Sequence, residues 1–329
     1  MIVPTLLALS LLQADAKPAM LSRVFAPNQK YTYDVKSHLQ LENRQRGLDT
    51  FMPEDFDMNY TFTAEVQQSK ADGIVVLHYQ RPTMTQIQGE TWNSQPQSKV
   101  DKVNLDYLLT VSPINEILET IEQKKPAAKI PPKKAKWMTG ITVQGGNPIG
   151  QFIGEMYRLS LFIGPVDSAL DFAPKLPFTE VKPGDTWKRT IGYQPQKLKD
   201  KDGKSVVQRL DYTYTYRGPV QVNGKTFQRV TADLDLKTDL AEWAKQFMPE
   251  GDASDGPQLS KLPLNLKGTI EFDLDPKTFN TVAARASSEG GFQVFLSDAP
   301  KDPLFETRLR GTTTMSLRSI AMVSAKKPQ

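Results

Sequence analysis

The chain has 329 residues, of which 39% are hydrophobic and 24% charged, with a formal net charge of +4. That length can bury a large core in one or two domains, and the composition is ordinary for a globular protein. Lys and Arg are scattered among nearly as many acidic residues, which argues against a nucleic-acid-binding surface. Without cysteine the chain can form no disulfide, thiol nucleophile or thiolate metal site.

The first sixteen residues have the pattern of a secretory signal peptide, although no Lys or Arg precedes the apolar run. The run Leu6–Leu12 is followed by Ala14-Asp15-Ala16, a small-x-small cleavage pattern. The alternative is a buried N-terminal strand or helix. We expect an exported protein, periplasmic, in the cell envelope or extracellular, and no later segment is apolar enough to form a transmembrane helix.

One pattern of turn, strand and hairpin occurs in both halves of the chain. The matching segments are 27–31, 60–63 and 72–73 in the first half, and 183–187, 212–215 and 223–224 in the second. The hairpin turns are Asp72-Gly73 and Asn223-Gly224, pairs that accept the positive φ angles of two-residue turns. Self-similarity at this spacing predicts a duplicated all-β unit.

Alternating apolar and polar residues predict strands over most of the chain. In chain order these strands are 30–41, 59–66, 74–79, 210–216, 225–236, 268–274, 281–286, 292–296 and 307–320. Turns are predicted between the later strands at Asp275-Pro276, Gly290-Gly291 and Asp302-Pro303.

Three segments are predicted to be helical. In residues 113–121, Ser112 and Pro113 form a typical start, and Ile114, Ile117, Leu118 and Ile121 give one apolar face. Residues 239–247 repeat this arrangement. Residues 149–163 are apolar on most sides, so this helix must be buried or cover an apolar surface.

The fold class is therefore predicted as mainly β with a few helices, a β-rich α+β fold of two tandem antiparallel curved sheets, or half-barrels, each covered by helices. The expected divisions are a signal peptide (1–16), a first β-repeat (17–123), a Lys/Pro-rich linker (124–136), an apolar helical segment (137–175) and a second β-repeat (176–329).

The apolar helices provide the candidate ligand-binding residues, because a curved sheet under a helix can hold an apolar ligand. These candidates are Phe152, Ile153, Met156, Leu159, Phe162, Leu240, Trp243 and Phe247. The linker lysines are candidates for contact with an anionic membrane surface, the alternative being a solvated linker. They are Lys124, Lys125, Lys129, Lys133, Lys134 and Lys136.

Catalytic residues are not predicted. His38 and His78 each lie in a predicted strand, and no HxH or HExxH spacing suggests a metal site. Asp273 and Asp275 precede Pro276 and are interpreted as turn residues rather than a catalytic pair. We therefore expect no metal, no cofactor and no enzymatic activity.

The motif Val181–Trp187, with Val222–Lys225 after it, resembles a pattern in uncharacterised exported bacterial proteins. Their architecture is similar to the half-barrel of the periplasmic lipoprotein carriers and the related lipid-binding lipoproteins. This resemblance implies binding of acyl chains under the sheet. The present chain differs in having no lipidation cysteine and in its tandem form.

The leading hypothesis is an exported, non-enzymatic protein that binds a lipid, a lipoprotein acyl chain or an envelope component. The alternative is a structural or adaptor module for envelope protein partners. A hydrolase that uses a carboxylate pair is the third hypothesis, and no nucleic-acid partner is expected.

Overall fold

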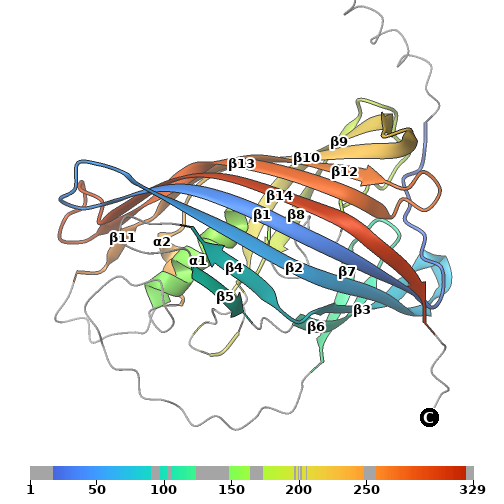
Figure 1. Ribbon diagram of the computed structural model, residues 1–329, viewed down its shortest axis with the longest axis horizontal. Helices are drawn as coiled ribbons and strands as arrows, with labels where there is room; N and C mark the ends of the chain where they lie inside the picture. The colour runs from blue at the N-terminus through green and yellow to red at the C-terminus, as the bar shows by residue number, and fades with distance from the viewer. Residues whose placement is uncertain are drawn as a thin grey trace, which may run out of the picture.

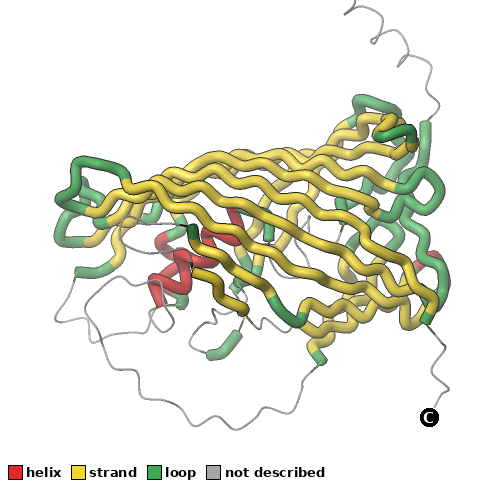
Figure 2. Tube along the Cα trace, in the orientation of Figure 1, coloured by secondary structure: helices red, strands yellow, loops and turns green. Residues whose placement is uncertain are grey.

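The computed structural model describes residues 18–89, 97–101, 105–123, 148–163, 173–195, 198, 200, 202–204, 206–247 and 257–323. Strands make up most of this part of the chain (Figure 2). Their bounds are β1 Gln29–Gln45, β2 Met52–Ser69, β3 Val75–Arg81, β4 Met84–Gln88, β5 Gln97–Asp101, β6 Leu105–Val111, β7 Ile117–Glu122, β8 Thr186–Tyr193, β9 Gln208–Val222, β10 Lys225–Asp239, β11 Leu259–Lys261, β12 Pro263–Leu274, β13 Thr281–Leu296 and β14 Phe305–Met322. The helices are α1 Pro148–Ser160 and α2 Ala241–Lys245, with a 3-10 turn at Ala71–Gly73.

The strands form one 14-stranded antiparallel sheet in the order β7-β6-β3-β2-β1-β14-β13-β12-β10-β9-β8. Strands β4 and β5 attach beside β2, and β11 pairs with β13. The sheet is curved, and α1 and α2 lie on its concave side (Figure 1). The β-rich class is as predicted, but both halves contribute to one sheet instead of forming two separate half-barrels.

The two halves are joined by the pairing of β1 with β14. This ladder runs from Gln29 opposite Met322 to Gln45 opposite Phe305. Strand β1 opens the meander β1–β2–β3, and β14 ends the path β10–β12–β13–β14. The first and last strands of the described chain therefore meet in the middle of the sheet, which removes the edges that two separate sheets would expose.

Both predicted turn pairs have positive φ angles, but only Asn223-Gly224 forms a two-residue turn. Asp72-Gly73 lies in a longer connection, residues 70–74, between β2 and β3. Asp72 and Gly73 have φ values of 58° and 71°. Asn223 and Gly224 have φ values of 51° and 75°, and join β9 directly to β10. Positive φ at both central positions matches the right-handed twist of the flanking strands.

The predicted turn at Gly290-Gly291 is wrong, because both glycines lie inside β13. A Cβ atom at Gly290 would be 2.0 Å from the carbonyl oxygen of Asn265, and one at Gly291 would be 2.3 Å from that of Thr307. Glycine here allows close approach of the backbones of β12, β13 and β14 within a continuous strand.

The predicted helix over 113–121 is also wrong. Residues Ile117–Glu122 form β7, paired with β6. Ser112 does act as a capping residue, but its hydroxyl accepts the backbone N–H of Glu116 at 3.0 Å within a hairpin turn. Asn115 completes that turn with a φ of 65°. The β-branched residues of the segment suit a strand, and β6 provides the ladder partner.

The other two predicted helices are present as α1 and α2. The predicted signal peptide (1–16) and lysine linker (124–136) lie outside the described residues. None of the helices in the described ranges is long and apolar enough to span a membrane.

Replacing Gly290 with alanine tests the close strand approach. The added Cβ would meet backbone rather than a movable side chain, so we expect Gly290→Ala to lower the free energy of unfolding by about 2–3 kcal/mol. The control is Gly154→Ala in α1, where a Cβ has no neighbour within 4 Å and alanine should stabilise by about 0.5–1 kcal/mol. Equal urea midpoints for the two variants would contradict the account.

Candidate functional site

The concave side of the sheet is apolar from β3 to β9, and we call it the inner face. Along β1, the side chains of Tyr31, Tyr33, Val35, Leu39 and Leu41 are buried and the intervening residues are more exposed. The same alternation recurs in β2, β3, β12 and β14. An antiparallel sheet with one apolar face must bury that face against another element.

Aromatic rings form a continuous row on the first half of the inner face. Phe62 of β2 stacks on Tyr33 of β1, with ring centroids 4.9 Å apart, and on Tyr79 of β3 at 5.3 Å. Tyr60 lies 6.4 Å from Phe62. Stacked pairs of this kind add stability beyond their area of burial.

The C-terminal turn of α1 docks on a row of small residues in the sheet. Ser288 faces Gly268 in β12 and Gly311 in β14. A Cβ at Gly268 would be 2.4 Å from the ring of Phe162, and one at Gly311 would be 3.0 Å from Leu161. Only residues of this size let the end of the helix approach so closely.

Hydroxyl groups of the sheet cap this end of the helix. Ser288 Oγ donates to the carbonyl oxygen of Ser160 at 2.5 Å, and Thr313 Oγ1 donates to that of Leu161 at 2.8 Å. These two carbonyls are among those that a helix terminus leaves without partners.

Phe162 ends α1 in a strained conformation. Its φ is 56°, and the N–H of Ile163 donates to the carbonyl of Arg158 at 2.9 Å, the pattern of a Schellman cap. Glycine is the usual residue at this position, and another residue costs of order 1 kcal/mol or more. The ring of Phe162 packs over Gly268 and lies 6.3 Å from Tyr212, which offsets that cost.

The other end of α1 packs against α2. Phe152 lies 5.3 Å from Trp243 and 6.5 Å from Phe247, measured between ring centroids. All eight predicted ligand-binding residues are buried, with at most 8% of any of them exposed. Three of them, from segments far apart in the sequence, thus form one aromatic cluster between the helices. Their role in ligand binding stays a prediction.

A buried polar cluster, which we call the Glu155 cluster, lies between α1 and the sheet. Glu155 accepts a hydrogen bond from Arg158 Nη1 at 2.5 Å, and the Tyr193 hydroxyl lies 3.0 Å from its Oε2. Arg81 of β3 is completely buried, with its guanidinium 4.6 Å from the ring centroid of Tyr60. The sequence analysis did not predict this cluster. The feature that could have indicated it is the presence of two charged residues, Glu155 and Arg158, in an otherwise mainly apolar helix.

A second buried polar cluster closes one end of the sheet. Residues 18–28 run across this end (Figure 1), where Arg23 donates to Asn280 Oδ1 at 2.6 Å and to Asn115 Oδ1 at 3.1 Å. Lys175 donates to the carbonyl of Asn115 at 2.7 Å. Because Asn115 precedes β7 and Asn280 precedes β13, these bonds hold distant parts of the sheet together.

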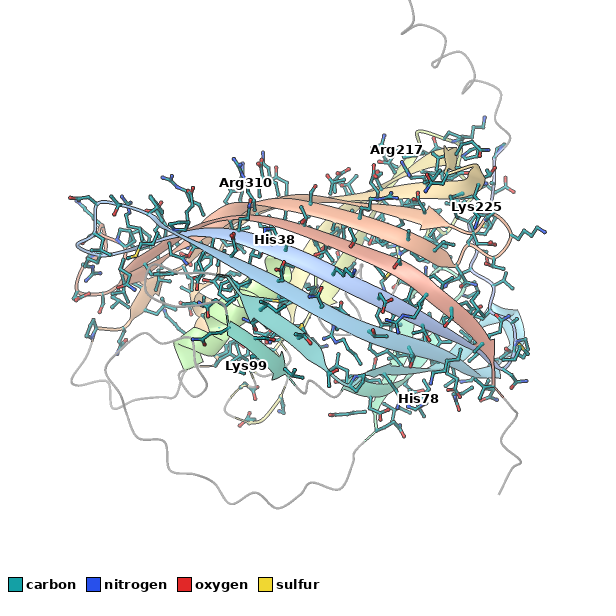
Figure 3. The ribbon with its side chains drawn as sticks, in the orientation of Figure 1. His38, His78, Lys99, Arg217, Lys225 and Arg310 are labelled. Atoms are coloured by element: carbon teal, nitrogen blue, oxygen red, sulfur yellow. The ribbon has the colours of Figure 1, made fainter. Side chains whose placement is uncertain are left out.

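The predicted histidines and aspartates lie away from the inner face. His38 and His78 are on the other, outer face, within hydrogen-bond distance of Asp57 (2.9 Å) and Asp106 (2.6 Å) (Figure 3). Among the described residues, no group of three or more possible ligands is placed to hold a metal ion.

The two aspartates near Pro276 have different roles. Asp273 is buried and pairs with Arg229 at 2.8 Å and Arg285 at 3.2 Å. Asp275 accepts the backbone N–H groups of Lys277 and Thr278. Burial alone would raise the pKa of Asp275, but these hydrogen bonds lower it below its usual value. The predicted turn function fits Asp275, whereas Asp273 belongs to a salt bridge within the sheet.

Hollows of about 650 and 710 Å³ lie along the sheet. Their linings are mainly polar and include Asp34, Lys36 and Arg318 in one, and Glu42, Lys267 and Arg310 in the other. Arg310 projects away from the helices (Figure 3). Neither hollow is lined by any of the eight predicted ligand-binding residues.

Comparisons with known proteins do not assign a family. No protein-family model matches the chain, and no curated protein sequence matches it significantly. A structure of lipovitellin, described for its lipid–protein interactions, aligns with a TM-score of 0.44 and 11% identity over 93% of this chain and 26% of the lipovitellin chain. DynF, from the dynemicin biosynthesis pathway of Micromonospora chersina, aligns with a TM-score of 0.19 and 8% identity, over 92% and 86% of the two chains.

The chain thus spans only 26% of the lipovitellin chain that it matches. At these scores neither similarity assigns a function. The resemblance to the lipoprotein carriers stays a prediction.

The buried tyrosines predict alkaline unfolding. Burial raises the pKa of Tyr33 and Tyr79 to about 12, and it also raises the pKa of Tyr157 and Tyr212. A pKa raised in the folded state gives stability that is complete below the unfolded value of about 10 and is lost as the pH rises toward 12.

The absorbance of tyrosinate near 295 nm measures this effect. We expect most tyrosines to ionise together with unfolding, above about pH 11, whereas the urea-unfolded chain should titrate near pH 10. Titration of the folded protein near pH 10, with its circular dichroism unchanged, would contradict the buried arrangement.

Proposed function

We propose that the protein is an exported, non-enzymatic protein that binds a lipid or acyl chain between the inner face and the helices α1 and α2. The observation that carries this proposal is the small size of the helix that covers the inner face. A 14-stranded sheet with one apolar face is covered in its middle by a helix of only 13 residues.

The cover is attached in a way that is compatible with displacement. Its C-terminal turn is held by hydroxyl groups of Ser288 and Thr313, and its middle by the Glu155 cluster. These are discrete polar contacts that can break and re-form. Sliding of a packed helix over a sheet is a common form of conformational change.

The apolar side chains of α1 and a bound acyl chain contribute similar free energies when they are buried on the inner face. Burial of Phe152, Ile153, Met156 and Leu159 of α1 contributes roughly 6–12 kcal/mol, at about 1.5–3 kcal/mol per side chain. An acyl chain of about twelve carbons contributes about 10 kcal/mol, at about 0.8 kcal/mol per methylene. A bound chain could therefore replace most of the apolar contacts that a displaced helix gives up.

Other observations support the remaining parts of the proposal. The pattern of residues 1–16 supports export. Three buried polar side chains contact a helix end or other residues of the sheet and its turns, which supports a structural use of these groups. They are Ser288, Arg23 and Asp273.

Native mass spectrometry of protein purified from an exporting host tests the proposal. We expect a mass above that of the polypeptide, and organic extraction should release the adduct as lipid. Protein that carries no adduct, and takes up none of a panel of fatty acids and phospholipids, would contradict it.

Locking α1 to the sheet provides a matched control. The chain has no cysteine, so the double variant Ser160→Cys, Ser288→Cys can form only the intended disulfide within one molecule. We expect the oxidised form, checked by thiol titration, to lose uptake of a fluorescent fatty acid and the reduced form to regain it. Equal uptake by both forms would show that α1 need not move.

An adaptor module is the second candidate, favoured by the edge strand β7. Strand β7 pairs only with β6 among the described strands. Its Leu118 and Ile121 are 55% and 47% exposed. An exposed edge with apolar side chains can accept a strand from another protein. A pull-down from an envelope extract that recovers a specific protein, lost on Leu118→Lys, would favour this role.

A further inference from the structure

The Glu155 cluster combines groups from three separate parts of the molecule. Glu155 and Arg158 belong to α1, Arg81 ends β3, and Tyr193 ends β8. Glu155 and Arg81 are completely buried, and Arg158 and Tyr193 are 7% and 3% exposed. β3 and β8 lie on opposite sides of the sheet centre. A carboxylate of the helix therefore meets groups of both halves of the sheet inside the concavity.

The charges of the cluster act on one another. Burial is the main cause that lowers the pKa of Arg81; neighbouring Arg158 lowers it further, and Glu155 raises it. Burying an ionised group is expensive unless a charge partner and hydrogen bonds compensate. The Glu155 carboxylate supplies negative charge at this position in the interior.

Displacement of α1 would change this arrangement in a defined way. Glu155 moves with the helix, whereas Arg81 and Tyr193 remain on the sheet. The Tyr193 hydroxyl then loses the Glu155 carboxylate as a partner, and the buried Arg81 guanidinium loses a nearby negative charge. An ionised carboxylate at the end of an acyl chain has the same chemistry as the Glu155 side chain and can accept from both donors.

On the basis of the proposed function, we propose that Glu155 is an internal substitute for the head group of the ligand. The ligand class is a single-chain amphiphile with a carboxylate head, such as a fatty acid. Its chain lies on the inner face, and its head group takes the place of Glu155 beside Arg81 and Tyr193. A carboxylate then lies near Tyr193 and Arg81 in both the closed and the loaded state.

The test compares three probes at pH 8: laurate, 1-dodecanol and acetate. Laurate and dodecanol share a twelve-carbon chain but differ in head-group charge, and acetate has the charge without the chain. The readout is the ratio of the affinities for laurate and dodecanol. This ratio is unaffected by a general loosening of α1, which changes both affinities alike.

Two variants of the Glu155 cluster and one control variant are compared. Glu155→Gln removes the competing charge with little change in shape, and Arg81→Gln removes a donor that stays on the sheet. Glu242→Gln on α2 is the matched control, because its carboxylate is 85% exposed and forms a surface ion pair with Lys245 of the same helix. Circular dichroism checks that each variant is folded.

We expect Glu155→Gln to tighten the binding of laurate and dodecanol alike, by about tenfold, since the carboxylate that either chain displaces no longer holds the closed state. Arg81→Gln should lower the ratio about tenfold or more, and Glu242→Gln should leave it unchanged. Acetate should not bind measurably. If Arg81→Gln does not fold, Tyr193→Phe, which removes the hydroxyl donor that stays on the sheet, should lower the same ratio and decides the question.

Failure of the head-group proposal and failure of the proposed function give different results. If the wild type binds dodecanol and laurate but Arg81→Gln leaves their ratio unchanged, the head-group proposal is wrong and the proposed function stands. Acetate binding as tight as laurate binding would also overturn it, because the site would then be a simple anion site. If the wild type binds neither amphiphile, both proposals fail.

Discussion

The pairing of β1 with β14 is the constraint on which the rest of the structure depends. Seventeen residues of β1 run along β14, from Gln29 opposite Met322 to Gln45 opposite Phe305. This ladder joins the N-terminal and C-terminal strands of the described chain in the middle of the sheet. Without it the two halves would each have an exposed edge, and the inner face would be divided.

One continuous sheet requires one continuous cover. The inner face is too large for α1 alone, and aromatic side chains of the sheet itself fill part of the concavity, as in the row Tyr33–Phe62–Tyr79. The C-terminal end of α1 reaches the sheet closely where Gly268, Ser288 and Gly311 leave room. The C-terminal end of the helix is thus held by close packing on a row of small sheet residues. Its middle is held by the polar contacts of the Glu155 cluster.

The sequence allowed local features to be predicted where one physical requirement dominated. Asp72-Gly73 and Asn223-Gly224 could be assigned as turns because few residues accept positive φ at both positions. The helix α1 was evident because most of its residues are apolar and only Glu155 and Arg158 are charged. The alternation of β1 was equally clear over residues 30–41.

Features that depend on distant residues could not be predicted. Gly290-Gly291 has the composition of a turn, and only the backbone oxygens of Asn265 and Thr307, from neighbouring strands, show why glycine is needed inside a strand. Residues 117–122 have a helical spacing of apolar residues, but pairing with β6 overrides it. The Glu155 cluster combines residues from β3, α1 and β8, so the two charges within α1 are visible in the sequence but their partners in the sheet are not.

The central claim is that α1 is a displaceable cover over the inner face. Hydrogen–deuterium exchange with and without bound laurate tests it most directly. The account predicts faster exchange in residues 148–160 of the loaded protein, with β1 and β14 equally protected in both states. Protection of α1 that is unchanged or increased in a protein with laurate bound would contradict the account.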